Sequence, residues 1–167
     1  MAPDSAGSAA TQVRAGIVDV LILAPAPPGS ENRWQALTLR RAHGTRCTGA
    51  WEIVHGRIER GERPEAAALR EVAEETGLAP ERLYSITVNP FYLPHTDSVE
   101  LAIVFAAVVA PGATPTLGFE HDAWEWLTPH AASARLAWPR ERDALAQALS
   151  LLASGDAGPV EDVLRVH

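Results

Sequence analysis

The segment 56–78, with the sequence GRIERGERPEAAALREVAEETGL, limits what this chain can fold into more than any other. Pro64 suits the first turn of a helix and Gly77 suits the position after the last turn, so the segment predicts a loop followed by one helix. Residues 51–54, just before it, are typical of a strand. A strand, a loop and a helix in that order indicate an α/β fold.

Three glutamates of the predicted helix share one face. Glu71, Glu74 and Glu75 fall within an arc of about 100°, because residues three and four apart are neighbours on a helix. Carboxylates this close repel one another, whereas a divalent cation would make the arrangement favourable. Mg²⁺ fits best because it takes oxygen ligands and shares them with phosphates, and Mn²⁺ is a plausible substitute. The alternative is an exposed helix whose glutamates serve solubility.

The remaining helix positions predict how the helix packs. Leu69, Val72 and Ala73 fall opposite the glutamates and are expected to pack on the sheet. Ala67 and Ala68 fall on the glutamate side, where their small side chains are expected to leave room for a ligand.

The pattern G-x5-E-x7-R-E-V-x-E-E-x-G-L resembles the Nudix box, the signature of hydrolases that cleave nucleoside diphosphates linked to another moiety. The resemblance implies an αβα sandwich with a mixed β-sheet, metal-dependent hydrolysis of a diphosphate bond, and frequent homodimers. It also implies catalytic and metal-binding roles for the box residues. Glu71, Glu74 and Glu75 would hold metal, Glu74 or Glu75 would activate water, Arg70 would orient the glutamates, and Glu62 would approach the metal from the loop.

Residues outside the helix complete the expected metal site. The resemblance implies that the backbone carbonyl of His55 binds metal and that the box glycine, Gly56, lies against the substrate. It also implies a metal-binding glutamate from a later loop, for which Glu120 is favoured over Glu100. An ordinary exposed acid is the alternative for Glu120.

Four further residues are candidates for binding substrate. Arg40 and Arg41 end a predicted strand, where alternation points one of them inward to grip phosphate; a solvated strand end is the alternative. Phe91 and Tyr92 lie in a predicted loop and could stack on a base or pterin ring, or instead anchor that loop.

The substrate class is suggested by two short strings. WEIVHG and EHDAWEWL resemble the subgroup that acts on dihydroneopterin triphosphate and dATP. The alternatives are a non-catalytic sensor of nucleotides or nucleotide sugars and an isomerase with a catalytic cysteine. Cys47, in RCTGAW, does not match the isomerase motif.

Length and composition limit the domain organisation, the partners and the location that can be expected for this chain. The 167 residues predict one domain over residues 13–155, with a disordered tail at 1–12 and a C-terminal tail at 156–167. A net charge of −7 argues against duplex nucleic acid as a partner, and no apolar run is long enough for a membrane span. One cysteine and no recognisable secretory signal make a cytoplasmic location the expectation.

Hydrophobic patterning predicts the remaining elements. Residues 13–23 and 34–41 are expected to form two antiparallel strands around a Pro- and Gly-rich loop. Further strands are expected at 83–88, 99–109 and 123–127, and helices at 130–135 and 140–153.

Overall fold

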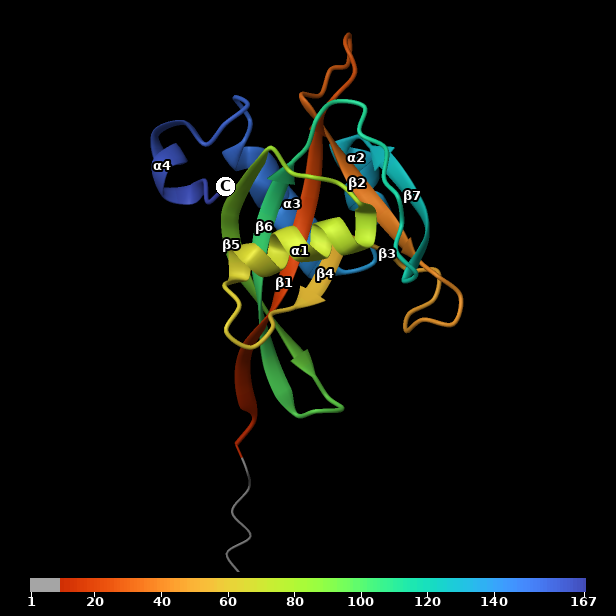
Figure 1. The fold of residues 1–167 in the computed structure, drawn as a ribbon, viewed down its shortest axis with the longest axis vertical. Coiled ribbons are helices and arrows are strands. Elements are labelled where there is room, and N and C mark those ends of the chain that lie inside the picture. Colours follow the sequence, from red (N-terminus) through yellow and green to blue (C-terminus); the bar gives the residue numbers. More distant parts are fainter. Residues whose placement is uncertain (1–9) are drawn as a thin grey trace, which may run out of the picture.

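The computed structural model describes residues 10–167 and shows a mixed sheet with helices on both faces (Figure 1). Most of the expected N-terminal tail, residues 1–9, lies outside the described residues. The strands are β1 Gln12–Pro25, β2 Trp34–Arg41, β3 Trp51–Glu52, β4 Val54–Arg57, β5 Arg82–Leu93, β6 Ser98–Val108 and β7 His121–Leu127. The helices are α1 Pro64–Thr76, α2 Pro129–Arg135, α3 Pro139–Leu151 and α4 Glu161–Leu164, with a 3₁₀ turn η1 at Gly158–Val160.

Strand β1 organises the sheet. The main order is β3-β2-β1-β6-β5, while β4 pairs with β1 and β7 pairs with β2. β1 and β6 are parallel and the other pairs are antiparallel, which confirms the predicted mixed sheet and α/β sandwich. None of the helices in residues 10–167 has the length and apolar character that a membrane crossing requires.

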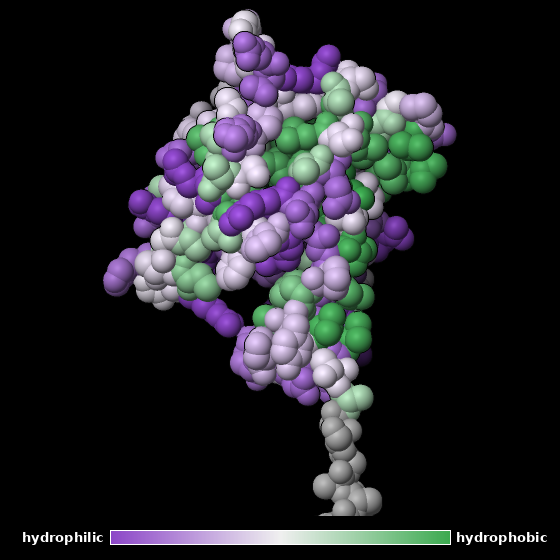
Figure 2. All heavy atoms as spheres, turned by 180° about the vertical axis from the view of Figure 1, so that it is seen from behind, coloured by the Kyte–Doolittle hydropathy of each residue, from purple (hydrophilic) through white to green (hydrophobic). Residues whose placement is uncertain are grey.

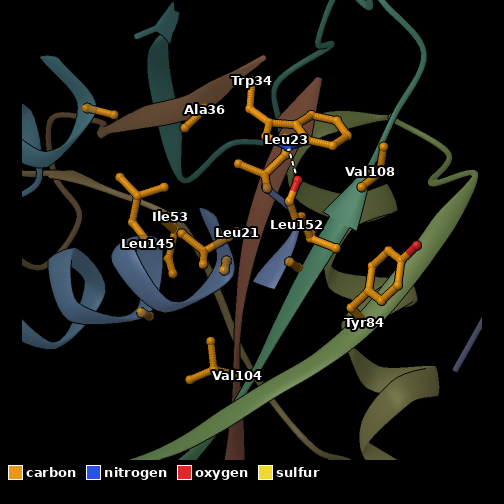
Figure 3. Packing of buried hydrophobic residues seen from close by; sticks show 14 of the residues in the cluster. Leu21, Leu23, Trp34, Ala36, Ile53, Tyr84, Val104, Val108, Leu145 and Leu152 are labelled. Carbon is orange, nitrogen blue, oxygen red and sulfur yellow. Dashed lines mark hydrogen bonds between the residues drawn. The ribbon is translucent and has the colours of Figure 1, made fainter. Parts of the chain in front are cut away.

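Alternation along β1 divides the core into two layers. Leu21 and Leu23 face the layer that contains α2 and α3, whereas Val20 and Ile22 face the layer that contains α1. In the first layer the indole N–H of Trp34 donates to the backbone oxygen of Leu152 at 2.7 Å (Figure 3). The side chains of β1 are thus buried on both faces, as in a central strand.

Helix α1 begins at Pro64 and ends before Gly77, as predicted. Gly77 has φ 65° and donates its N–H to the backbone oxygen of Ala73, so it ends the helix in a left-handed conformation that favours glycine.

The prediction for the faces of α1 was partly wrong. Ala67 and Ala68 are fully buried with Val72 against the sheet and leave no room for a ligand, while Ala73 is exposed. The buried stripe passes through positions 68, 72, 75 and 76, which follows the helical period but is rotated toward Glu75. The small alanines let the helix approach the sheet closely.

Two strand boundaries differ from the sequence prediction. The expected strand 51–54 is two short strands, β3 and β4, separated at Ile53. Strand β5 continues to Leu93, so Phe91 and Tyr92 lie in a strand and not in a loop. Pro90 fits within β5 because β5 is the last strand in the main sheet order, where a missing N–H is tolerated.

The C-terminal residues dock on the edge of the sheet. Val166 donates its backbone N–H to Leu83 at 2.8 Å, and Leu83 donates to His167 at 3.1 Å. The hydroxyl of Tyr84 donates to Glu161 at 2.9 Å. The segment therefore covers one end of β5, although its sequence predicted no element there.

Glu141 on α3 gives a pH-dependent prediction. Its side chain is fully buried, and burial, with the nearby charges of Asp19 and Glu52, raises its pKa well above 4.5 despite the opposing charge of Arg140. The folded protein therefore retains a proton that the unfolded chain loses above about pH 4.5, and stability falls as pH rises. We expect Glu141→Gln to raise the melting temperature progressively between pH 5 and pH 8, measured by circular dichroism. A gain that is equal at every pH would contradict this explanation.

Candidate active site

Arg70 connects the carboxylates of the helix and its preceding loop. Its Nε and Nη2 each donate to Glu62 at 2.9 Å, and its Nη1 donates to Glu71 at 2.7 Å and to Glu74 at 3.4 Å. The hydrogen bonds from Arg70 are the main cause of a lowered pKa at Glu62. Nη2 also donates to the backbone oxygen of Arg57 at 2.8 Å, which ties α1 to β4. Arg70 thus holds the carboxylates of Glu62 and Glu71 in place through hydrogen bonds.

Gly56 lies directly against Glu71. A Cβ atom at position 56 would be 1.9 Å from the carboxyl carbon of Glu71, far inside van der Waals contact. A side chain at position 56 would therefore displace the Glu71 carboxylate from the place where Arg70 holds it. At this position of the box, the backbone of Gly56 makes the contact with the Glu71 side chain.

We expect Gly56→Ala to reduce turnover by about tenfold or more, because displacing Glu71 misplaces a group at the reacting centre. Gly16→Ala is a matched control, since a Cβ at that position meets nothing within 4 Å. The measurement is kcat/KM on the best substrate, with the melting temperature recorded for both variants. Equal activity in the two variants would contradict a role for the close approach.

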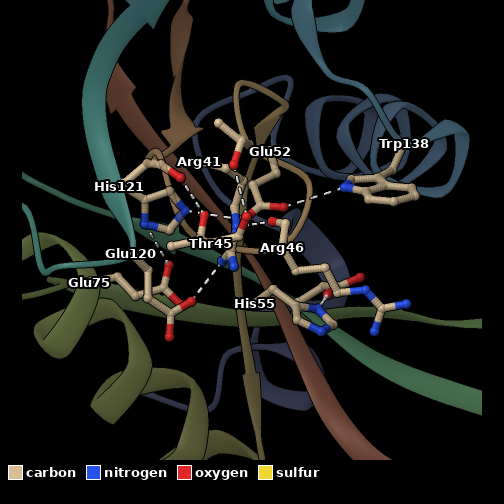
Figure 4. Close-up of polar contacts among 12 residues, drawn as sticks. Arg41, Thr45, Arg46, Glu52, His55, Glu75, Glu120, His121 and Trp138 are labelled. Atoms are coloured by element: carbon tan, nitrogen blue, oxygen red, sulfur yellow. Dashed lines mark hydrogen bonds and ion pairs between the residues drawn. The ribbon is translucent and has the colours of Figure 1, made fainter.

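Glu75 is the most buried carboxylate of the helix. Burial, followed by the charges of Glu71, Glu120 and Glu52, raises the pKa of Glu75 to about 9. Its Oε2 has no hydrogen-bond partner among residues 10–167 and lies 3.7 Å from Nδ1 of His121 (Figure 4). Nε2 of His121 lies 3.1 Å from Glu52. Glu75 is thus a buried acid whose charge needs compensation.

Glu120 joins this group from the other side. It lies just before β7, and its Oε2 accepts a hydrogen bond from Nη1 of Arg41 at 2.7 Å. Arg41 also donates to Glu52 at 3.3 Å. Glu100, the weaker candidate, is buried in β6 beside Ser98 and does not line the same pocket. The fold therefore brings the favoured loop glutamate next to the helix.

These side chains surround a small pocket that we call the carboxylate pocket. Its donors are oxygen atoms, and the unpartnered Oε2 of buried Glu75 points to a missing positive partner, so the residues fit a divalent cation. In residues 10–167 no three acidic, histidine or cysteine side chains are already grouped closely enough to hold an ion. Arg70 and Arg41 instead engage several of the acids. The pocket is lined by Glu71, Glu74, Glu75, Gly118, Phe119 and Glu120.

A larger cavity of about 640 Å³ lies beyond Arg41, and we call it the arginine cavity. Seen from behind in Figure 2, the surface is hollowed between the main body and the lower part that carries the β5–β6 hairpin. Arg46 and Arg57 line it and form no salt bridge within the described residues. Positive charge in a cavity beside a group of acids suits a ligand that carries phosphates.

The wall of the arginine cavity combines charge with aromatic rings. The guanidinium of Arg140 lies 4.4 Å from the ring centre of Phe91 and 5.5 Å from that of Trp138. Asp19 accepts from Arg140 at 3.1 Å and lies 2.5 Å from Nδ1 of His55. Burial raises the pKa of Asp19, but the hydrogen bonds and charges of His55 and Arg140 outweigh it and hold this pKa below its usual value.

The predicted substrate residues divide between two locations. Arg41, Phe91 and Tyr92 line the arginine cavity, although Tyr92 is half-exposed at its rim. Arg40 lies outside both pockets, paired with Asp122 at 2.7 Å and placed over the ring of Trp51. Alternation along β2 thus turned one arginine inward and the other outward, as expected.

Sequence reasoning missed several polar groups at the site. Asp19 and Glu52 sit inside hydrophobic strands, and a charged residue in such a strand was the available signal, because lone charges are costly to bury. Trp138 also lines the arginine cavity and donates its N–H to Glu52 at 3.4 Å. The positions of Arg140 and His121 depend on the tertiary fold, so the sequence carried no local signal for them.

Comparison with known proteins gives a consistent result. The family model for the NUDIX domain matches residues 18–148. An octanoyltransferase of Myxococcus xanthus is 37% identical over 102 residues, which span 60% of this chain and 29% of that protein. A MutT-like protein of Streptomyces ambofaciens is 36% identical over 101 residues, 60% of each chain. The matched part therefore spans less than two thirds of either relative.

Similarity to solved structures supports the fold. The dihydroneopterin triphosphate pyrophosphohydrolase of E. coli superposes with a TM-score of 0.60 and 24% identity, covering 78% of this chain and 92% of that one. This likeness confirms the architecture of the sheet and its flanking helices.

Proposed function

The chain belongs to the NUDIX domain family, and on that premise we propose that it hydrolyses a diphosphate bond in a nucleotide-like substrate with the help of a divalent metal ion. The observation that carries this proposal is the placement of the carboxylate pocket beside the arginine cavity, with Arg41 between them (Figure 4). One pocket offers oxygen ligands, and the other offers positive charge and aromatic rings. Together they match a phosphate chain attached to a ring.

Glu71, Glu74 and Glu75, with Glu120 and the backbone carbonyl of His55, are the residues that would hold the metal. Mg²⁺ suits this donor set and Mn²⁺ would replace it. When bound, the ion supplies polarisation of the diphosphate and lowers the pKa of a water molecule.

The protein's own side chains have separate tasks in this proposal. Glu74 or Glu75 accepts the proton from the attacking water, since carboxylates close to the reacting phosphorus are the available bases. Arg70 keeps Glu71 in position through their 2.7 Å hydrogen bond. Arg41, which lines the arginine cavity and donates to Glu120 at 2.7 Å, could also donate to a phosphate oxygen.

The ring of the substrate would occupy the arginine cavity. Phe91 and Trp138 both line this cavity close to Arg140 and can stack on a planar heterocycle. A purine such as that of dATP and the pterin of dihydroneopterin triphosphate both meet this requirement. We propose these two triphosphates as the first substrates to test.

A substrate panel tests the proposal. Purified protein treated with EDTA is incubated with dATP, the other nucleoside triphosphates, dihydroneopterin triphosphate, dinucleoside polyphosphates and nucleotide sugars, with and without Mg²⁺. We expect release of pyrophosphate or phosphate from at least one compound only when Mg²⁺ is present. Tight binding of a compound without any turnover would instead support a non-catalytic sensor and overturn the hydrolase proposal.

A further inference from the structure

His121 is a buried imidazole between two acids (Figure 4). Its side chain is 1% exposed at the start of β7, and its Nε2 lies 3.1 Å from Oε1 of Glu52. Its Nδ1 lies 3.7 Å from Oε2 of Glu75. Neither Nδ1 of His121 nor Oε2 of Glu75 has a hydrogen-bond partner among residues 10–167. Because buried polar groups are almost always hydrogen-bonded, these two facing atoms point to a contact between the two side chains.

A bulge in β7 turns His121 toward helix α1. Ala123 and His121 lie opposite consecutive residues of β2, which leaves Asp122 as an extra residue in β7. Trp124 packs against the core layer that contains α1. Strict alternation would place His121 on the opposite face of the sheet from Trp124, but one extra residue reverses the alternation. The bulge therefore gives the imidazole the direction from which it meets Glu75.

Glu52 holds the other nitrogen of the imidazole. Its Oε1 also accepts a hydrogen bond from Nη1 of Arg41 at 3.3 Å, and its Oε2 accepts one from the indole N–H of Trp138 at 3.4 Å. Strands β3 and β7, which carry Glu52 and His121, both pair with β2. The sheet thus fixes the ring and this acid relative to each other, and Nδ1 is left to face Glu75.

We propose that His121 is a positioning residue whose Nδ1–H donates to Oε2 of Glu75 and holds that carboxylate at the carboxylate pocket. The 3.7 Å separation is about 0.7 Å longer than an ordinary N–H···O hydrogen bond, a difference that a small rotation of either side chain removes. His121 does not line the pocket, so it acts on the metal only through Glu75. This inference rests on the proposed function for the metal-binding role of Glu75.

Substitution can separate the two ring nitrogens. The side-chain amide of Asn can place an N–H donor near the position of Nδ1, and that of Gln can place one near Nε2, because these nitrogens are equally many bonds from the backbone. Phe keeps a planar ring and removes both nitrogens. The contact with Glu75 is therefore available to His121→Asn, whereas His121→Gln retains only the contact with Glu52 and His121→Phe retains neither.

The first readout is metal binding, which needs no turnover. Mn²⁺ is titrated into each metal-free protein, and free Mn²⁺ is followed by electron paramagnetic resonance. We expect His121→Asn to bind Mn²⁺ within about threefold of wild type, and His121→Gln and His121→Phe to bind it about tenfold more weakly or worse, as when a group that positions a ligand is lost. His43→Phe is a matched control, because His43 is exposed and lines neither pocket.

The second readout is turnover at varied Mg²⁺, with the melting temperature recorded for every variant. In His121→Gln and His121→Phe we expect the Mg²⁺ concentration for half-maximal activity to rise about tenfold, while KM for the nucleotide stays within about twofold. A residue that served folding alone would lower the melting temperature without this split. If His121→Phe does not fold, the comparison of His121→Asn with His121→Gln decides the question.

The outcomes for this inference and for the proposed function are distinguishable. Weak Mn²⁺ binding in His121→Gln that is restored in His121→Asn, without turnover in any protein, would support the positioning role and reject the hydrolase. Equal Mn²⁺ affinity in wild type and in His121→Gln would overturn the inference. Equal losses in His121→Asn and His121→Gln would overturn it as well, because the contact through Nδ1 would then have no effect of its own.

Discussion

Replacing Glu75 by Gln is expected to reduce metal-dependent turnover by about 10²- to 10⁴-fold, the range that a lost general base typically produces. Glu75 is buried, its pKa is raised to about 9 by burial and by neighbouring acids, and its Oε2 has no partner in the described residues. A carboxylate with these properties has its charge compensated only when a cation binds. Gln keeps the shape and hydrogen-bonding capacity of the side chain but cannot supply the charge or accept the proton.

The control for Glu75→Gln is Glu81→Gln, which removes the same charge from an exposed position after α1. kcat and KM are measured on the best substrate at saturating Mg²⁺, together with the melting temperature. We expect the loss of activity to appear in kcat and not in KM, because the proton transfer and the metal contact matter most in the transition state. Turnover near that of wild type in Glu75→Gln would show that the metal and base assignments are wrong.

Replacing Arg70 by Ala is expected to lower kcat/KM by about 10²-fold, since a small displacement of groups at the reacting centre can have that effect. Arg70 makes hydrogen bonds to Glu62, Glu71, Glu74 and the backbone of Arg57, so its loss frees three acids at once. Arg70→Lys should recover little activity, because an ammonium group cannot reproduce the two parallel hydrogen bonds to Glu62.

Arg63→Ala is the matched control for Arg70, because its side chain is 81% exposed just before α1 and, among the acids of residues 10–167, pairs only with Glu65. Both variants are assayed for kcat/KM and for thermal unfolding. A drop in melting temperature without a drop in activity at low temperature would mean that Arg70 serves stability alone.

The sequence was most informative where function and local structure coincide. Pro64 and Gly77 fixed the limits of α1, and the spacing of Glu71 and Glu75 put both acids at one pocket. These signals are local, because a helix of regular period places residues three and four apart together. The mixed sheet followed from the family resemblance and is confirmed by the parallel pairing of β1 with β6.

The sequence was least informative about packing. Which side of α1 is buried depends on how the helix lies on the sheet, so Ala67 and Ala68 were placed on the wrong face. The length of β5 depends on its pairing with β6 and not on its own residues, so Phe91 appeared to be in a loop.

The residues around the arginine cavity could not be predicted from their positions along the sequence. Asp19, Glu52, His121 and Arg140 come from β1, β3, β7 and α3, which the fold brings together around the arginine cavity and its border. No spacing rule connects residues that distant along the chain. Buried charges within hydrophobic strands are the signal that would have drawn attention to Asp19 and Glu52.

Direct metal binding tests the central claim, that the acids of the carboxylate pocket hold a divalent cation, without relying on a substrate. Mn²⁺ is titrated into metal-free wild type and Glu75→Gln, and free Mn²⁺ is followed by electron paramagnetic resonance. In wild type we expect saturable binding of Mn²⁺, and we expect Mg²⁺ to displace the bound Mn²⁺. In the variant we expect Mn²⁺ to bind about tenfold more weakly or worse, as when a carboxylate ligand, or a group that positions a ligand, is lost. Equal Mn²⁺ binding in the two proteins, or no saturable binding in wild type, would contradict the account.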